Sequence, residues 1–404
     1  MSVTSDITTF FRNYLEQESL FKDKQKLQAQ FIPETIRHRD EQVHTIANIL
    51  APSLRKERPS NIFIYGKTGT GKTLVSRYTT KKLEAVAKQQ NIPLLTIYVN
   101  CKLKKVADTD YRLLAELTRE LGKNIPPTGL PTDEVYRYFF ETLEQKKHNT
   151  IIILDEIDQL IRKAGDEIIY NLTRMNAELK NAQIAIIGIS NDLTFQNNLD
   201  PRVKSSLSEE EILFPPYNAF HLQEILTDRC KEAFHDGVIE EGVIQKCAAY
   251  SAREHGDARR ALELIRVAGE LAEREGAKTI TLEHVDKAED KIERDRIFDA
   301  VATQPKQVKT TIYAIFLCEE HTTNETIFTG ELYEVYRKLC DHTALRPLTQ
   351  RRISDILAEL DMLGIINAKI ISKGRFGRTR EITLAIPPTL KDRLKKYLKK
   401  EVQG

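Results

Sequence analysis

Long apolar runs are missing from this sequence of 404 residues. A helix that crosses a bilayer needs about 20 predominantly apolar residues in succession, and no segment approaches that length. The first six residues also lack the basic and then apolar pattern of a secretory signal peptide. We therefore expect a cytoplasmic protein that does not associate with membranes.

Cysteine is scarce, and its spacing excludes two kinds of small stabilised domain. The chain has five cysteines, which lie far apart at Cys101, Cys230, Cys247, Cys318 and Cys340. This odd and scattered set supports neither a disulfide framework nor a C-x-x-C metal site. The nine histidines show no ligand spacing either. We expect reduced, mostly buried cysteines and no structural metal.

Net charge is small but unevenly distributed. The whole chain carries a formal charge of +2, yet residues 300–404 hold 18 Lys and Arg against 12 Asp and Glu. Residues 1–299 hold the remaining 43 Lys and Arg and 47 Asp and Glu. The formal charge is therefore about +6 for residues 300–404 and about −4 for residues 1–299. The length and the 41% hydrophobic content predict two or three domains. The asymmetry favours a C-terminal domain that binds a polyanion, although a basic run is also typical of a solvated face.

The most informative stretch is residues 66–73, which read Gly-Lys-Thr-Gly-Thr-Gly-Lys-Thr. It follows an apolar run, precedes a helical pattern and matches the phosphate-binding loop G-x-x-x-x-G-K-[ST]. Inward backbone N–H groups and the helix N-terminus attract phosphate there. We expect Lys72 to reach the β- and γ-phosphates of ATP or ADP and the Thr73 hydroxyl to bind Mg²⁺. The candidate nucleotide-binding residues of the loop are Gly66, Thr68, Gly69, Thr70, Gly71, Lys72 and Thr73.

A second chemical signal follows the apolar run 151–154, where Asp155 and Glu156 stand together. A continuous apolar run predicts a strand buried on both faces of a parallel sheet, and ligands bind at the carboxyl ends of such strands. We therefore expect Asp155 to lie beside the phosphate loop and to hold Mg²⁺ through water. Glu156 can orient or deprotonate an attacking water. The two carboxylates are typical of a Walker B pair.

Further candidates lie around the same site. Asn191 follows the predicted strand 183–189, where its amide can hydrogen-bond the γ-phosphate or the water, with a turn residue as the alternative. We expect Arg202 on a loop at the rim, available to a neighbouring subunit. A turn before residue 40 is expected to bring His38 and Arg39 near the phosphate loop, or to leave them as solvated charges.

Residues 217–297 predict a helical lid. Helical patterns cover 222–230, 243–253, 259–274 and 284–294. Asp257 is expected to cap the third helix, which places Arg259 in its first turn. From that position Arg259 can reach back to the nucleotide and couple the lid to its phosphate state.

The pattern changes again after residue 309. Residues 350–360 predict a helix with Thr349 as its N-cap, and Ile353, Ile356, Leu357 and Leu360 form one buried stripe. Two β-like runs, 365–372 and 380–386, follow. Between them lies a glycine-rich, cationic tip, so the pair predicts a hairpin with the dimensions of the wing of a winged helix.

A winged helix of this kind either grips duplex DNA or serves protein contacts. The clustered charge at the tip favours DNA, with the helix N-terminus at base edges and the tip in a narrow minor groove. The candidate DNA-binding residues are Thr349, Gln350, Arg351, Arg352, Ser354, Arg375, Phe376, Gly377, Arg378 and Arg380.

The order of these motifs resembles that of the AAA+ superfamily: a phosphate loop, an Asp-Glu pair, a strand-end Asn, a rim Arg and Gly-Asp-x-Arg at the start of a lid helix. Three stretches make the resemblance more specific. They are Asp-Pro-Arg-Val-Lys-Ser-Ser-Leu at 200–207, Phe-Pro-Pro-Tyr at 214–217 and Gly-Asp-Ala-Arg-Arg-Ala-Leu at 256–262. They resemble archaeal replication-origin initiators, which are related to the large origin recognition complex subunit and the eukaryotic helicase-loading factor. The likeness runs from about Phe31 onward.

The resemblance implies roles for several residues. Asn191 would be sensor 1, Arg259 sensor 2 and Arg202 the finger or tether, while Tyr217 joins the nucleotide-binding candidates. Residues 102–131 would contain an insertion that touches DNA. Eukaryotic relatives usually have a second Arg where this chain has Ser206. Hydrolysis is therefore expected to be slow or dependent on a partner.

We expect an α/β protein with an AAA+ P-loop ATPase core at 1–216, including an N-terminal extension at 1–30. An α-helical lid follows at 217–298 and a winged helix at 299–404. The expected function is an ATP-dependent, nucleoid-associated replication initiator that binds duplex origin DNA as a monomer or DNA-dependent oligomer. ATP binding and slow hydrolysis would act as a switch for recruitment of the replicative helicase. The alternatives are an AAA+ clamp loader or motor and a nucleotide-regulated winged-helix transcription factor.

Overall fold

The structure is a computed structural model that describes residues 18–102, 109–126, 128–195, 199–207, 209–321, 327–372 and 378–403. The chain divides into two compact units, Met1–Val285 and Asp286–Gly404. The division falls within helix α12 (Leu282–Ala302), so the three domain limits given above stay predictions. All five cysteines are free and buried, as expected. Of the helices in the described ranges, none combines the length and apolar content that a membrane span requires.

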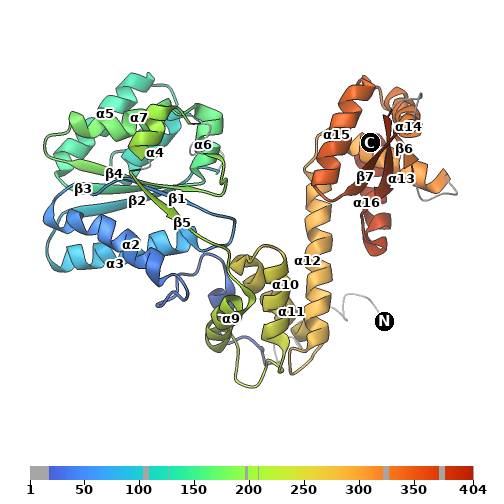
Figure 1. Ribbon diagram of the computed structural model, residues 1–404, viewed down its shortest axis with the longest axis horizontal. Coiled ribbons are helices and arrows are strands. Elements are labelled where there is room, and N and C mark those ends of the chain that lie inside the picture. Colours follow the sequence, from blue (N-terminus) through green and yellow to red (C-terminus); the bar gives the residue numbers. More distant parts are fainter. Residues whose placement is uncertain are drawn as a thin grey trace, which may run out of the picture. The chain divides into compact units, whose positions relative to one another are not determined.

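A parallel sheet of five strands organises the first unit (Figure 1). Its spatial order is β2-β3-β4-β1-β5, and every neighbouring pair is parallel. The interior strand β3 is buried at every position, which explains its continuous apolar content. The strands are β1 (Ile62–Tyr65), β2 (Leu94–Asn100), β3 (Asn149–Asp155), β4 (Gln183–Ser190) and β5 (Glu210–Leu213).

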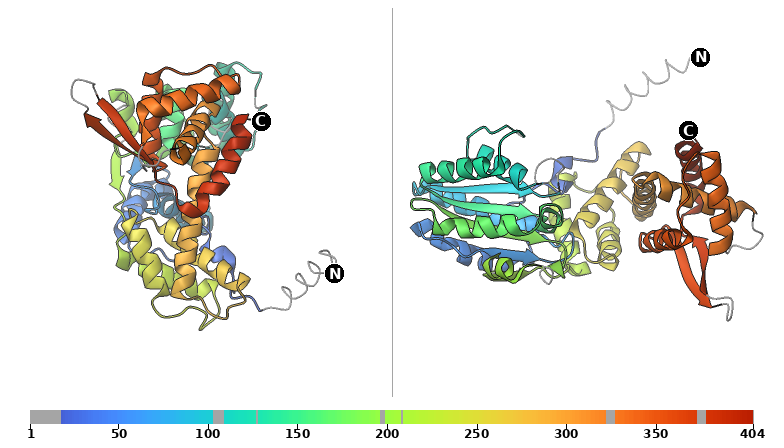
Figure 2. Two further views of the ribbon diagram at one scale, coloured as in Figure 1. Left: turned by 90° about the vertical axis from the view of Figure 1, so that its right-hand side faces the viewer. Right: turned by 90° about the horizontal axis from the view of Figure 1, so that it is seen from above.

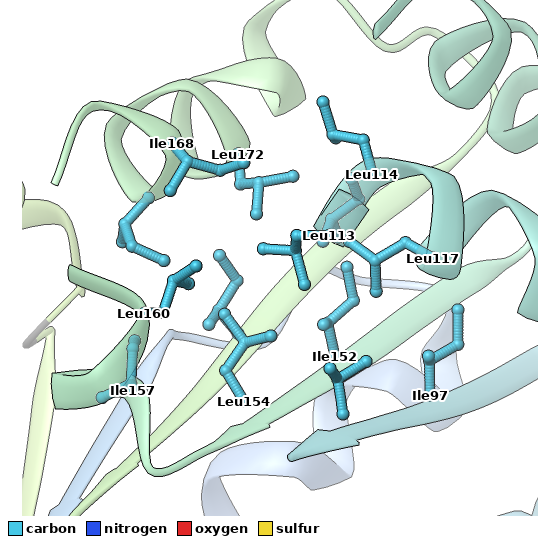
Figure 3. Packing of buried hydrophobic residues seen from close by; sticks show 14 of the residues in the cluster. Ile97, Leu113, Leu114, Leu117, Ile152, Leu154, Ile157, Leu160, Ile168 and Leu172 are labelled. Atoms are coloured by element: carbon cyan, nitrogen blue, oxygen red, sulfur yellow. The ribbon is translucent and has the colours of Figure 1, made fainter. Parts of the chain in front are cut away.

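Helices cover both faces of this sheet (Figures 1 and 2). Helices α2 (Asp40–Leu50) and α3 (Lys72–Gln89) lie on one face. The other face carries α4 (Asp110–Glu120), α5 (Thr132–Lys146), α6 (Ile157–Ala164) and α7 (Glu167–Arg174). Figure 3 shows Leu113 and Leu117 of α4 pointing toward Ile152 of β3, together with apolar side chains of α6 and α7. This core fixes the strand ends that carry the candidate site.

The expectation that Arg202 lies on a loop is wrong, because it lies on helix α8 (Pro201–Leu207). Pro201 opens the helix, where its missing N–H costs nothing. The Asp200 carboxylate accepts a hydrogen bond from the Arg202 backbone N–H at 2.8 Å, which caps the first turn. The Asp-Pro pair was therefore a helix-start signal.

Three helices of the predicted lid lie wholly within the first unit: α9 (Ala219–Ala233), α10 (Val243–Arg253) and α11 (Ala258–Arg274). Each contains one of the predicted helical patterns, and α12 contains the fourth. Asp257 caps α11 as predicted, since its side chain accepts from the N–H groups of Arg259 and Arg260. Short 3-10 turns complete the described part of the unit at η1 (Lys24–Leu27), η2 (Ala51–Arg55) and η3 (Met175–Ala177).

The first described segment, residues 18–37, is bound to this lid. Phe21 forms a bridge with Phe234 just after α9, and the Lys22 N–H donates to the carbonyl of Ala233 at 2.8 Å. The side chain of Arg229, only 6% exposed, donates to the carbonyls of Lys26 and Phe31. The segment then leads into helix α2, which packs on the sheet, so it connects the lid with the core.

The second unit has a three-stranded antiparallel sheet, in the order β6-β8-β7, packed against helices. Its core includes the predicted stripe of α15, and all four stripe residues are buried. Figure 2 shows the β7–β8 hairpin extending from the helices of this unit. The elements are α13 (Lys306–His321), β6 (Ile327–Phe328), α14 (Thr329–His342), α15 (Gln350–Met362), β7 (Ile366–Ser372), β8 (Arg378–Leu384) and α16 (Pro388–Gln403).

Candidate nucleotide site and nucleic-acid interface

The loop between β1 and α3 surrounds the ammonium group of Lys72. This side chain is 4% exposed, and its Nζ donates to the carbonyls of Gly66 and Lys67 at 2.7 Å each. Burial, followed by the charge of Arg259, lowers the pKa of Lys72 to about 8. A phosphate beside the two cations would offset this cost, because an opposite charge favours the protonated amine. The site therefore fits an anion.

Asp155 is the centre of a hydrogen-bond cluster at the end of β3. Its Oδ2 accepts from the Thr73 hydroxyl and from the Tyr98 hydroxyl at 2.8 Å each. Its Oδ1 accepts from the Glu156 N–H at 3.0 Å. Asp155 is 6% exposed. A hydroxyl and a carboxylate side by side are oxygen ligands of the kind that Mg²⁺ prefers, so the residues fit the metal.

Glu156 has a strained backbone, with φ at 55° in the left-handed region. It is the N-cap residue of α6, and its carboxylate lies 3.7 Å from Lys102 Nζ. Strain of this kind in a non-glycine residue is commonly found at functional sites. Glu156 and the exposed Asn191 both line the same cavity beside Asp155. The structure thus brings the Walker B pair and the strand-end amide together.

Two adjoining cavities extend from the phosphate loop. The phosphate-side cavity is lined by the loop residues from Gly69 to Thr73, Asp155, Glu156, Asn191 and Arg259, among others. The nucleoside-side cavity shares Gly69, Gly71, Thr73 and Arg259 and continues between residues 28–37, α9 and α11. Sequence reasoning missed the second wall, which includes Phe31, Ile225 and Leu262. The apolar Phe-Ile-Pro at 31–33 was the only signal that pointed to it.

The lid helix α11 meets the phosphate loop directly. The Ala258 N–H donates to the carbonyl of Gly69 at 3.2 Å. Gly69 has φ at 73°, and a Cβ there would lie 1.8 Å from the carboxylate of Asp257. Only glycine fits this approach without displacement. Arg259 follows in the first turn and lines both cavities.

His38 and Arg39 lie beside the loop, but neither lines the two cavities. Arg39 is 3% exposed, donates from Nε to the Thr70 carbonyl at 3.0 Å, and lies 4.0 Å from the ring centroid of Tyr217. Tyr217 does line the nucleoside-side cavity. The His38 ring stacks on that of His221 in α9, with centroids 4.2 Å apart. These side chains brace the loop and pack where the core meets the lid. Thr68 is exposed and lies outside both cavity linings.

Arg202 lies outside both cavity linings as well. Its guanidinium makes two hydrogen bonds to the Asp200 carboxylate, at 3.0 and 3.1 Å, and lies 5.3 Å from the ring centroid of Tyr170. Ser206, at the position of the missing second Arg, accepts a hydrogen bond from Thr173 of α7 at 3.1 Å. Arg202 is therefore already paired with a carboxylate of its own helix start.

The N-terminus of α15 presents the predicted polar face. Thr349 caps the helix by accepting from the Arg352 N–H, which confirms that prediction. Gln350 and Arg351 are exposed, while the Ser354 hydroxyl donates to the carbonyl of Gln350 at 3.1 Å. Arg352 differs from Arg351, because it lies 3.7 Å from Asp355 and 3.6 Å from Glu359.

The predicted wing is confirmed as the antiparallel pair β7–β8. Arg380 lies in β8 opposite Ile370, and its N–H donates to the Thr329 hydroxyl at 3.2 Å. Arg375, Phe376 and Gly377 fall outside the described residues, as does the side chain of Arg378. Residues 103–108, within the predicted insertion, also fall outside them.

Comparisons with known protein families match three parts of the chain. Residues 55–195 match an AAA domain, residues 223–290 match the Cdc6 AAA+ ATPase-type lid domain, and residues 299–391 match the CDC6 C-terminal winged helix domain. These matches confirm the expected fold class, with its AAA core, helical lid and winged helix.

Whole-chain relatives agree with the domain matches. An ORC1-type DNA replication protein of Pyrococcus abyssi is 53% identical over 94% of this chain and 90% of its own length. ORC1-type DNA replication protein 1 of Methanosarcina mazei is 50% identical over 93% and 90%. The structure of the Aeropyrum pernix ORC1 protein in complex with DNA is similar, with a TM-score of 0.83 and 42% identity over 95% and 98% of the two chains. This chain therefore belongs to the family of ORC1-type DNA replication proteins.

Proposed function

We propose that this protein is an ATP-dependent replication initiator that binds duplex origin DNA through its winged helix. ATP binding and slow hydrolysis act as a switch for recruitment of the replicative helicase. The observation that carries the proposal is the direct contact between the phosphate loop and the lid helix, from the Ala258 N–H to the Gly69 carbonyl. Loss of the γ-phosphate on hydrolysis therefore alters this contact between the loop and the lid.

The residues of the cavity divide the work on the nucleotide. Mg²⁺, when bound with ATP, would neutralise the charge that develops on the phosphates during transfer. Lys72 would bind the β- and γ-phosphates, while Thr73 and Asp155 would hold the metal. Glu156 orients the attacking water and accepts its proton, and Asn191 fixes the water or the γ-phosphate. Arg259 contacts the phosphates from α11 and transmits their state to the lid.

The winged helix supplies the contacts to DNA. The exposed side chains of Gln350 and Arg351, at the N-terminus of α15, reach base edges and phosphates in the major groove. Arg375, Phe376, Gly377, Arg378 and Arg380 contact the minor groove and the DNA backbone. The Aeropyrum pernix ORC1 protein, 42% identical to this chain, has been solved in complex with DNA, which supports this assignment.

A ring-forming motor needs a complete trans-acting finger at every interface. Ser206 stands where eukaryotic relatives usually have a second Arg, and this difference favours a switch over a motor. Sedimentation with ATP and without DNA separates the two functions, since a stable closed ring indicates a motor and a monomer the switch. Genome-wide mapping of bound sites separates an initiator, concentrated at very few loci, from a transcription factor.

Glu156→Gln tests the catalytic assignment. The amide keeps the shape of the side chain but cannot accept the proton of the water, so phosphate release should fall at least 100-fold, in the range of general-base effects. ATP binding, measured by filter binding on the same sample, should survive. Intact turnover in this variant removes Glu156 from its role.

A further inference from the structure

Tyr98 makes a contact that the roles assigned above leave unused. It lies on β2, which pairs in register with β3 so that Asn100 stands opposite Asp155. Tyr98 lies two residues before Asn100, and its hydroxyl donates to Asp155 Oδ2 at 2.8 Å. The same oxygen accepts from the Thr73 hydroxyl, also at 2.8 Å. The neighbouring strand thus supplies a second donor to this oxygen, and a third to the carboxylate that is expected to hold the metal.

The Tyr98 hydroxyl is in its donating form at physiological pH, because a phenol has an ordinary pKa of about 10. The ring is held separately, since the guanidinium of Arg77 lies 5.0 Å from its centroid. Tyr98, Asn100 and Arg77 all line the phosphate-side cavity.

We infer that Tyr98 is a positioning residue for Mg²⁺, acting through Asp155 and without contacting the metal. The inference rests on the proposed function, in which the cavity binds ATP with Mg²⁺. Thr73 and the Glu156 N–H each hold one oxygen of this carboxylate. The Tyr98 hydroxyl adds a further donor to Oδ2 and so restricts rotation of the carboxylate about its terminal bond more tightly.

Metal chemistry makes this orientation important. Mg²⁺ demands near-ideal octahedral geometry and gives up its waters reluctantly, so a misdirected carboxylate is a poor partner. Hydrogen-bond partners of metal-binding carboxylates typically contribute about 10- to 100-fold to metal affinity or activity. The expected effect of losing the Tyr98 hydroxyl is therefore on the Mg²⁺ requirement.

The test is Tyr98→Phe, which removes the hydroxyl and keeps the ring beside Arg77. ATP binding is titrated first in EDTA and then against increasing Mg²⁺. In EDTA the dissociation constant should stay within about twofold of the wild type, because the variant keeps every group proposed to touch the nucleotide. The Mg²⁺ concentration that gives half of the metal-dependent tightening should rise about 10-fold. Tyr78→Phe is the matched control, since Tyr78 lies on α3 with Lys82 over its ring.

An Asp155→Asn background sharpens the measurement. If Tyr98 acts through Asp155, then adding Tyr98→Phe to Asp155→Asn leaves the Mg²⁺ dependence where the single Asn variant set it. An unchanged Mg²⁺ requirement in Tyr98→Phe overturns the inference. Equal weakening in EDTA and in Mg²⁺ also overturns it, because this indicates a general structural role. A wild-type protein that binds no ATP under any condition contradicts the proposed function itself, and that failure is visible before any variant is compared.

Discussion

The nucleotide site and the N-terminus of α15 hold their functional groups in opposite ways. At the nucleotide site, Lys72 and Asp155 are 4% and 6% exposed, and each makes several short hydrogen bonds. On α15, Gln350 and Arg351 are exposed on the surface of the helix. A small ligand with a metal requires fixed geometry, which burial provides. A duplex offers a repeating line of phosphates, which long and exposed cations can follow.

The largest effect is expected at the buried nucleotide site. Lys72→Ala removes a charged donor to the phosphates, so ATP affinity should fall by about 10- to 100-fold, corresponding to roughly 1.5–3 kcal/mol. Isothermal titration with ATP and Mg²⁺ measures it. Lys67→Ala is the control, because Lys67 lies in the same loop with an exposed side chain. Comparable losses in the two variants would mean that burial does not distinguish them.

A smaller effect is expected on α15. Arg351→Ala should weaken duplex binding by a few fold and reduce the slope of log K against log salt by about 0.9, the value for one phosphate contact. Fluorescence anisotropy with a duplex oligonucleotide over a salt series measures the slope. Arg352→Ala should change it less, since Asp355 and Glu359 already lie near that guanidinium. From the sequence alone, Arg375→Ala is expected to behave like Arg351→Ala.

The alternative outcome at Arg351 is equally informative. An unchanged slope with lost preference for origin sequence would assign Arg351 to base readout. A larger effect in Arg352→Ala than in Arg351→Ala would contradict the idea that neighbouring carboxylates reduce its contribution.

The smallest effect concerns His221 of α9, which stacks on His38 where the core meets the lid. Burial, followed by the charges of His38 and Arg39, lowers the pKa of His221 below its ordinary value of 6.5, while Glu224 opposes this. Between the lowered pKa and 6.5 the unfolded chain binds more protons than the folded protein, so stability falls as the pH drops. The stability linked to His221 is present above pH 6.5 and is lost toward the lower value. Thermal unfolding of the first unit at pH 7.5 and 5.5 measures this change, and in His221→Gln the difference should be smaller.

Much of the fold was readable from the sequence because its signals are local. The Thr349 and Asp257 caps each depend on a side chain bonding to an N–H two or three residues away. The buried stripe of α15 follows from helical periodicity alone. The helix that carries Arg202 has seven residues, which are too few for a clear apolar stripe, so its Asp-Pro start is the signal that the sequence offers.

The candidate site was only partly readable for a different reason. The phosphate loop and the Asp-Glu pair are contiguous in sequence, so their chemistry is visible in the letters. The bond from Tyr98 to Asp155 depends on the pairing register of β2 and β3, which no pattern in either strand specifies. The wall formed by residues 28–37 depends on contacts with helices about 200 residues away, and such segments carry no periodicity of their own.

That wall also sets the order in which the site can be completed during synthesis. The Lys26 carbonyl leaves the ribosome first, and its partner Arg229 follows 203 residues later. At about 5–20 residues per second, roughly 10 to 40 s of translation separate the two. During that interval the glycine loop has been synthesised but helices α9 and α11 have not, so the cavity that they line with residues 28–37 is still incomplete.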